Sequence, residues 1–285
     1  MRLSILYRGP LASCNYGCAY CPFAKHAETA AERAEDTNAL ERFVGWVDSR
    51  QGDNISVLFT PWGEALTRVR YRRALVRLTG TPHVEKAAIQ TNLSCRLDWV
   101  EDCDKSKLGL WTTYHPSEVA RTRFLARCFE LSRRGVRFSV GVVGLKEHAG
   151  EIEALRRELP PDVYLWINAF KRVAGYYGSE DLERFEAVDP LFHINNRHHP
   201  SRGRACLCGE SVISVAGDGT VRRCHFIREP IGNIYEQGFA ESLRARACTN
   251  STCGCHIGYV HMPGLDLYSV FGSGVLERAP EKFVR

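Results

Sequence analysis

The sequence lacks the long apolar runs that cross membranes. No stretch of its 285 residues approaches the roughly 18 consecutive apolar residues of a membrane-spanning helix. The first residues, Met1-Arg2-Leu3-Ser4, lead straight into a strand-like segment instead of a signal peptide. Dense runs of lysine or arginine are also missing, so we do not expect the protein to bind nucleic acid. The net charge of +5 does not by itself indicate a binding partner. These absences predict a cytoplasmic protein that does not contact membranes.

Disulfide bonds are not expected either, although the chain contains 12 cysteines. Thiols in the cytoplasm are kept reduced, and clustered cysteines there bind metal more often than they pair. Most of these cysteines gather in two groups, one near each end of the chain. The hydrophobic content of 44% allows a substantial core, enough for one large α/β domain with or without a small appendage.

The N-terminal group is Cys14, Cys18 and Cys21, in the spacing C-x3-C-x2-C. A [4Fe–4S] cluster usually takes four cysteines, so a compact trio leaves one iron open for a substrate or cofactor. A zinc knuckle is an alternative, but zinc normally uses four ligands in paired spacings, and no matching pair lies nearby in the sequence. An incidental cysteine cluster is the other alternative. The spacing favours an iron–sulfur site.

Hydrophobic periodicity predicts six strands separated by amphipathic helices. The predicted strands are Leu3–Tyr7, Ile55–Phe59, Lys86–Gln90, Leu108–Thr113, Val136–Val143 and Val163–Ala169. The apolar faces of the predicted helices are Leu40/Phe43/Val44/Val47, Leu66/Val69/Leu75/Val76, Phe124/Leu125/Cys128/Leu131 and Ile152/Leu155/Leu159. Such a series predicts a parallel α/β sheet covered by helices, either doubly wound or closed toward a barrel.

The cysteine trio, with Tyr20 directly before its last member, resembles the signature of the radical S-adenosylmethionine (radical SAM) enzymes. The resemblance implies a [4Fe–4S] cluster whose open iron chelates S-adenosylmethionine, with Tyr20 at the cofactor site. It also implies a partial (β/α)6 barrel over residues 1–175, with the cluster loop after the first strand. In parallel barrels the chemistry lies at the carboxyl ends of the strands, where functional residues are to be sought.

Three further segments resemble cofactor-binding stretches of this family. Gly63 and Glu64, after the second strand, match part of its Gly-Gly-Glu-Pro segment, which takes the ammonium group of S-adenosylmethionine, although Trp62 and Ala65 depart from it. A turn with a helix-capping glutamate is the alternative. Thr91 and Asn92 match the Thr-Asn that often ends the third strand. In the last segment, Val142 and Gly144 match a stretch that lies beside the adenine of the cofactor in this family. The alternative is an ordinary strand-to-helix turn, because such turns also use glycine.

Strand ends supply the remaining candidates in the barrel. Tyr114 and His115 follow the fourth strand and are predicted to face the cavity as catalytic or substrate-contacting residues. A histidine before a proline is also a common structural loop residue, although histidine can move protons near neutral pH. Asn168, near the end of the sixth strand, is a candidate cofactor ligand.

A linker over 176–204 is predicted to lead to a cysteine-rich extension over 205–285. The spacing C-x10-G-x4-C from Cys208 to Cys224 resembles the twitch and SPASM extensions of radical SAM enzymes, and Asp218-Gly219 predicts a β-hairpin turn within it. The resemblance implies one auxiliary [4Fe–4S] cluster, with a zinc ribbon as the alternative. Its candidate ligands are Cys208, Cys224, Cys253, Cys255, Cys206 and Cys248. The segment Gly264–Gly274 is a candidate cover for the barrel mouth.

The resemblance as a whole implies an enzyme that reductively cleaves S-adenosylmethionine to a 5′-deoxyadenosyl radical. That radical would remove a hydrogen atom from a small molecule or a ribosomally made peptide, and a flavodoxin or ferredoxin would supply the electron. Two alternatives stay open. One is a radical SAM enzyme that modifies tRNA, and the other is a non-catalytic zinc or iron–sulfur binding module.

Overall fold

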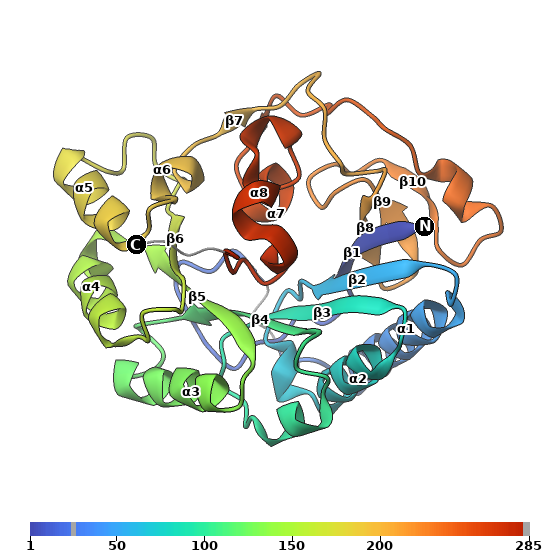
Figure 1. The fold of residues 1–285 in the computed structure, drawn as a ribbon, viewed down its shortest axis with the longest axis horizontal. Helices are drawn as coiled ribbons and strands as arrows, with labels where there is room; N and C mark the ends of the chain where they lie inside the picture. Colours follow the sequence, from blue (N-terminus) through green and yellow to red (C-terminus); the bar gives the residue numbers. More distant parts are fainter. Residues whose placement is uncertain (24–26, 282–285) are drawn as a thin grey trace.

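The computed structural model describes residues 1–23 and 27–281. Strands and helices alternate through the first half of the chain, and the helices lie outside a curved sheet (Figure 1). The strands are β1 (Arg2–Arg8), β2 (Asn54–Phe59), β3 (Val84–Thr91), β4 (Leu108–Tyr114), β5 (Arg137–Gly144) and β6 (Leu165–Ala169). The helices between them are α1 (Ala30–Ser49), α2 (Val69–Gly80), α3 (Arg121–Arg133) and α4 (Ala149–Glu158). All six predicted strands and all four predicted helices are present, but the apolar face predicted for the second helix is wrong in part, because Leu66 precedes α2 and Val69 is exposed.

The sheet is an open barrel in which β1 to β6 are parallel neighbours in chain order. Helices α5 (Ser179–Val188) and α6 (Phe192–Asn195) follow β6. Strand β8 (Val212–Ala216) then pairs parallel to β1, and β9 (Thr220–Arg222) and β10 (Pro230–Asn233) extend the sheet antiparallel beyond it. The hairpin predicted around Asp218-Gly219 is thus present, and it continues the barrel sheet at the edge next to β1.

Alternation along the strands gives the sheet two different faces. Outward side chains such as Ile5, Val57 and Ile89 form a buried core against the helices. Inward side chains such as Trp111 and Trp166 form a second core inside the barrel with the C-terminal part of the chain. Because strand side chains alternate with a period of two, β1, β2, β3, β4 and β6 each contribute to both cores.

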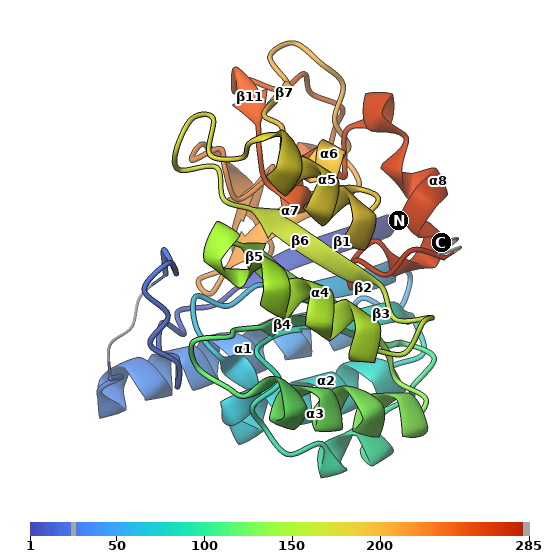
Figure 2. The same ribbon diagram turned by 90° about the vertical axis from the view of Figure 1, so that its left-hand side faces the viewer.

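The C-terminal part of the chain fills the barrel from the end at which the strands begin. Helices α7 (His256–Tyr259) and α8 (Leu267–Phe271) lie within the curve of the sheet in Figure 1, and Figure 2 shows α8 on the side opposite to the loop after β1. The guanidinium of Arg137, the first residue of β5, donates to Ser273 Oγ at 2.7 Å. The prediction that Gly264–Gly274 covers the mouth is therefore wrong, because this segment packs at the amino ends of the strands.

The remaining strands, β7 (His199–Pro200) and β11 (Thr252–Cys253), form a separate antiparallel pair that joins the segment after α6 to the last cysteines. In the part of the chain that the structure describes, no helix is long and apolar enough to cross a bilayer.

Candidate active site at the carboxyl ends of the strands

The cysteine trio lies in the loop between β1 and α1, at the carboxyl end of the barrel. Cys18 is buried, and Cys14 and Cys21 are half-buried. The backbone N–H of Cys21 donates to Cys18 O at 3.1 Å, which folds the two C-terminal cysteines into one turn. Gly17 N–H donates to Glu118 Oε2 at 2.9 Å, so the loop after β4 holds the cysteine loop from the opposite side.

Gly63 packs directly on the backbone of this loop. A β-carbon at Gly63 would stand 1.8 Å from the carbonyl oxygen of Ser13, which is much shorter than any allowed contact distance. The next residue, Glu64, donates its backbone N–H to the same oxygen at 3.0 Å. The segment after β2 therefore joins the cysteine loop through main-chain contact, which requires glycine at position 63.

The carboxylate of Glu64 is buried and ties the end of β2 to the end of β3. It accepts hydrogen bonds from Thr91 Oγ1 at 2.8 Å, Asn92 N at 2.5 Å and Leu66 N at 3.1 Å. Burial raises the pKa of Glu64 to about 7, although these three donors lower it. A carboxylate has about four acceptor positions, so one remains available for a cofactor ammonium. The hydrogen bond from Leu66 N also caps the short helix that follows, so Glu64 has the helix-capping role that the sequence analysis gave as the alternative.

This pKa predicts a pH-dependent stability. The ordinary pKa of Glu64 is 4.5 and the folded value is about 7, so the folded protein binds the proton more tightly than the unfolded chain. Its contribution to the free energy of unfolding is complete below the ordinary pKa and declines by about 3 kcal/mol as the pH rises through the folded value. Urea unfolding at about pH 5 and about pH 8 should show this decline in the wild type and not in Glu64→Gln. Equal declines in both proteins would contradict the assignment.

His115 and Tyr20 meet beside Cys18. His115 Nδ1 lies 2.9 Å from the Tyr20 hydroxyl and 3.3 Å from Cys18 Sγ. Burial lowers the pKa of His115 to about 4, so the imidazole is neutral at physiological pH. Both residues thus lie at the cysteine loop, and a catalytic role for His115 stays a prediction.

The predicted inward orientation of Tyr114 is wrong because the alternation along β4 places this side chain outward. The hydroxyl of Tyr114 donates to Glu151 Oε1 at 2.7 Å, and its ring packs on Phe124 of α3, so Tyr114 does not face the barrel interior. Val142 belongs to the outer core as well, and its neighbour Val143 is the half-buried inward residue. A hydroxyl that lies in the helix layer cannot contact a substrate inside the barrel.

The other predicted cofactor residues fall into two groups. Thr91 and Asn92 lie at the site: both bind Glu64, and Asn92 Nδ2 donates to Asn15 Oδ1 of the cysteine loop at 3.1 Å. Gly144 instead gives room to the hydroxyl of Tyr177, which donates to its carbonyl at 2.6 Å. Asn168 faces inward and is solvent-exposed, and the described residues make no hydrogen bond to its side chain. Its amide is free for a ligand.

Sequence reasoning missed two charged residues of the site, Glu118 and Arg8. Glu118 holds the cysteine loop, as described above. Arg8, the last residue of β1, stacks its guanidinium 4.2 Å from the ring centroid of Trp62 and donates from Nε to Thr60 O at 2.8 Å. Alternation along β1 puts Ser4, Leu6 and Arg8 on the inward side of the sheet. This pattern could have predicted that Arg8 lies at the mouth of the barrel.

The C-terminal cysteines gather beside the inner core, with one exception. Cys208 and Cys224 are buried in this core, and Cys206, Cys248 and Cys253 pack against it. The interaction between the thiols of Cys206 and Cys208 lowers the pKa of Cys206 and raises the pKa of Cys208. Cys255 differs in that it is exposed to solvent and does not pack against this core, although its thiol interacts with that of Cys253.

The donor set of the N-terminal cysteine loop suits an iron–sulfur cluster. Three thiols on one loop, beside a segment that admits only glycine, fit a cluster with one open iron. Within residues 1–23 and 27–281, no three His, Cys, Asp or Glu side chains converge closely enough to ligate one ion. A four-iron cube requires a wider arrangement, since each cysteine binds a different iron.

Comparison with solved structures relates this architecture to known proteins. The structure of native anSMEcpe with bound AdoMet superposes with a TM-score of 0.56 at 15% identity, over 85% of this chain and 83% of that one. Streptococcus suis SuiB bound to S-adenosylmethionine gives a TM-score of 0.57 at 15% identity, over 84% of this chain and 65% of that one. A complex of anSMEcpe with AdoMet and the Kp18Cys peptide gives 0.55, at 15% identity over 84% of this chain and 80% of that one. No family model and no curated protein matches the sequence.

Proposed function

From the radical SAM fold that this chain shares with those structures, we infer that the protein is an enzyme that cleaves S-adenosylmethionine reductively and removes a hydrogen atom from a small-molecule or peptide substrate. The observation that carries this proposal is the C-x3-C-x2-C loop of Cys14, Cys18 and Cys21, which Gly63 and Glu64 contact at the carboxyl end of the sheet. The fold supplies only the setting, and the residues at this loop supply the chemistry.

Each part of the site has a role in this proposal. Cys14, Cys18 and Cys21 would hold a [4Fe–4S] cluster, which supplies the electron that splits S-adenosylmethionine into methionine and a 5′-deoxyadenosyl radical. Glu64 would accept a hydrogen bond from the cofactor ammonium while Thr91 and Asn92 fix its carboxylate. The exposed amide of Asn168 would hold a ligand inside the barrel. The protein's task is then to orient one substrate hydrogen and exclude competing reactions.

Anaerobic reconstitution with iron and sulfide, followed by a cleavage assay, tests the proposal. We expect the reduced protein to convert S-adenosylmethionine to methionine and 5′-deoxyadenosine, and the spectrum of its cluster to change when the cofactor is added. Binding of zinc without cofactor cleavage would instead indicate a non-catalytic module. Methyl or methylthio groups found on tRNA would indicate the RNA-modifying alternative.

A separate prediction concerns the C-terminal cysteines. We propose that the auxiliary cluster takes its four ligands from Cys206, Cys208, Cys224, Cys248 and Cys253, because these side chains lie together beside the inner core. Cys255, the remaining candidate, is left out of this proposed set because it is exposed to solvent. The reconstituted wild type should contain about eight irons per chain, the content of two cubes.

Two single substitutions compare these positions. Cys224→Ala should lower the iron content to about four per chain, whereas Cys255→Ala should keep about eight. Iron loss in Cys255→Ala and retention in Cys224→Ala would contradict this ligand set. About four irons with one equivalent of zinc in the wild type would favour a zinc ribbon.

A further inference from the structure

The imidazole of His115 is within hydrogen-bond distance of a proposed cluster ligand. Its Nδ1 atom lies 3.3 Å from Cys18 Sγ and 2.9 Å from the Tyr20 hydroxyl. Cys18 is only 4% exposed, so this contact is shielded from water. No step of the proposed function uses this imidazole, although polar groups that contact a metal ligand commonly tune the metal.

Contacts from two loops hold the ring of His115 in this place. Its carbonyl oxygen accepts from the backbone N–H of Glu118 at 3.0 Å, which fixes the turn after β4. The ring stacks on that of Tyr20, with 6.0 Å between the centroids and 10° between the planes, and the ring of Tyr16 meets it edge-on at 5.8 Å. Both tyrosines belong to the cysteine loop, so the segment that carries Cys18 also positions the imidazole.

The state of the ligand sulfur determines where the proton of the imidazole lies. A cysteine that binds iron is a thiolate, which only accepts hydrogen bonds. The His115 atom that faces Cys18 must then be an N–H, which assigns the tautomer with the proton on Nδ1. The Tyr20 hydroxyl is a second donor, since burial raises the pKa of Cys18 and a hydrogen bond from Tyr20 lowers it. Both groups can therefore donate to the same sulfur.

We propose that His115 is a positioning residue that donates from Nδ1 to the sulfur of Cys18 and thereby raises the reduction potential of the core cluster. This inference rests on the proposed function, because it requires a [4Fe–4S] cluster on Cys14, Cys18 and Cys21. Reduction adds negative charge to the cluster, so a donor to its sulfur ligand stabilises the reduced state more than the oxidised state. An external electron donor then reduces the cluster more readily.

Two substitutions of similar shape test the donor. Asparagine places an amide N–H near the position of Nδ1, whereas leucine fills a similar space without a donor. In anaerobic redox titrations, His115→Leu should make the reduced core cluster roughly tenfold less favoured, which lowers the midpoint potential by about 59 mV. His115→Asn should keep the midpoint close to that of the wild type. The electron paramagnetic resonance signal that changes when S-adenosylmethionine is added identifies the core cluster.

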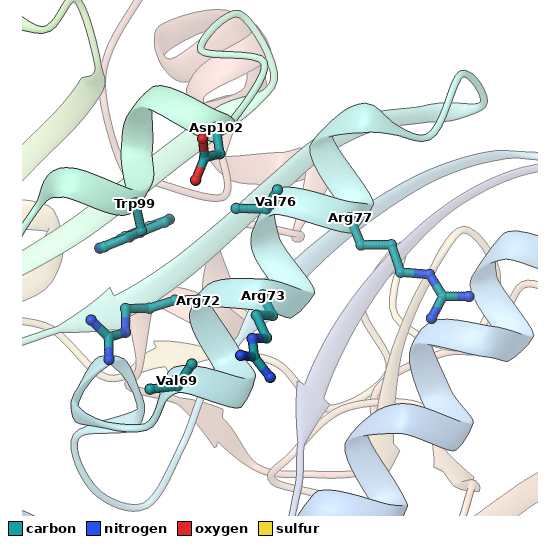
Figure 3. Close-up of a pocket in the computed structure, with 7 residues that line it drawn as sticks. All are labelled: Val69, Arg72, Arg73, Val76, Arg77, Trp99 and Asp102. Carbon is teal, nitrogen blue, oxygen red and sulfur yellow. The ribbon is translucent and has the colours of Figure 1, made fainter.

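Arg77→Gln is the control for a change of charge far from the cluster. Arg77 lies in the last turn of α2, where it lines a groove on the outer layer of the molecule (Figure 3). Its guanidinium pairs with Asp48 of α1. The helix begins beside the segment after β2 and runs toward the amino ends of the strands, so Arg77 is remote from the cysteine loop. We expect this variant to keep the wild-type midpoint.

A measurement on the wild type tests the same contact without a substitution. In protein labelled with ¹⁵N-histidine, pulsed electron paramagnetic resonance should detect a nitrogen weakly coupled to the reduced core cluster, and His115→Asn should lack this coupling. The inference fails if no histidine nitrogen couples to the cluster. It also fails if His115→Leu keeps its iron and the wild-type midpoint, or if the Asn and Leu variants have equal midpoints.

The outcomes separate this inference from the proposed function. A wild type that assembles no cluster on the three cysteines would overturn both. A cluster that responds to S-adenosylmethionine but shows no histidine coupling, and whose midpoint is the same in His115→Leu, would overturn only the role of His115. If His115→Leu loses its iron, the nitrogen coupling in the wild type decides between a donor and a residue that merely supports the loop.

Discussion

Replacing Cys14, Cys18 and Cys21 together by alanine should abolish the cleavage of S-adenosylmethionine. The three thiols are the proposed ligands of the core cluster, and alanine offers no metal ligand. Iron content should fall from about eight to about four per chain, since the C-terminal cysteines keep the proposed auxiliary cluster. Iron analysis and measurement of 5′-deoxyadenosine after anaerobic reduction provide the two readouts.

Cys128→Ala is the matched control for this experiment. Cys128 is buried in the outer core between α3 and the sheet, away from both cysteine groups, so its removal changes packing and not ligation. We expect this variant to keep both clusters and the cleavage activity. Cofactor cleavage at the wild-type rate in the triple variant would refute the proposed role of the loop.

Gly63→Ala should damage both stability and cofactor cleavage, although it adds one methyl group. The new β-carbon would stand 1.8 Å from the carbonyl oxygen of Ser13, and a backbone atom cannot move aside as a flexible side chain does. The cysteine loop or the segment after β2 must shift, which costs about 3 kcal/mol, at the upper end of the range for overpacking. That shift would also break the hydrogen bond from Glu64 N to Ser13 O.

Gly45→Ala provides the comparison, because a β-carbon at Gly45 in α1 meets no atom within 4 Å. Alanine within a helix is favoured over glycine by about 0.5–1 kcal/mol, so this variant should be slightly more stable than the wild type. Thermal unfolding and the cleavage assay report on both proteins. If Gly63→Ala unfolds and reacts like Gly45→Ala, the close contact at the cysteine loop does not exist in solution.

The strands and helices could be predicted because their signal is local. Period-two and helical hydrophobic patterns located all six strands and four helices, and the cysteine spacing identified the loop after β1. The same local alternation also determines the side of the sheet on which Tyr114 lies. Counting alternate residues along β4 from the inward Trp111 places Tyr114 outward, where the structure has it.

The amino-acid sequence by itself determined the α/β class, the order of the elements and the position of the cysteine loop, because these depend on neighbours along the chain. The tertiary structure alone decided which distant groups meet. Three such meetings involve segments that are far apart in the sequence. They are the contact of Gly63 with Ser13, the hydrogen bonds from Thr91 and Asn92 to Glu64, and the filling of the barrel by the C-terminal helices. Such contacts depend on the curvature of the sheet and on how far each loop reaches, and no local pattern encodes either.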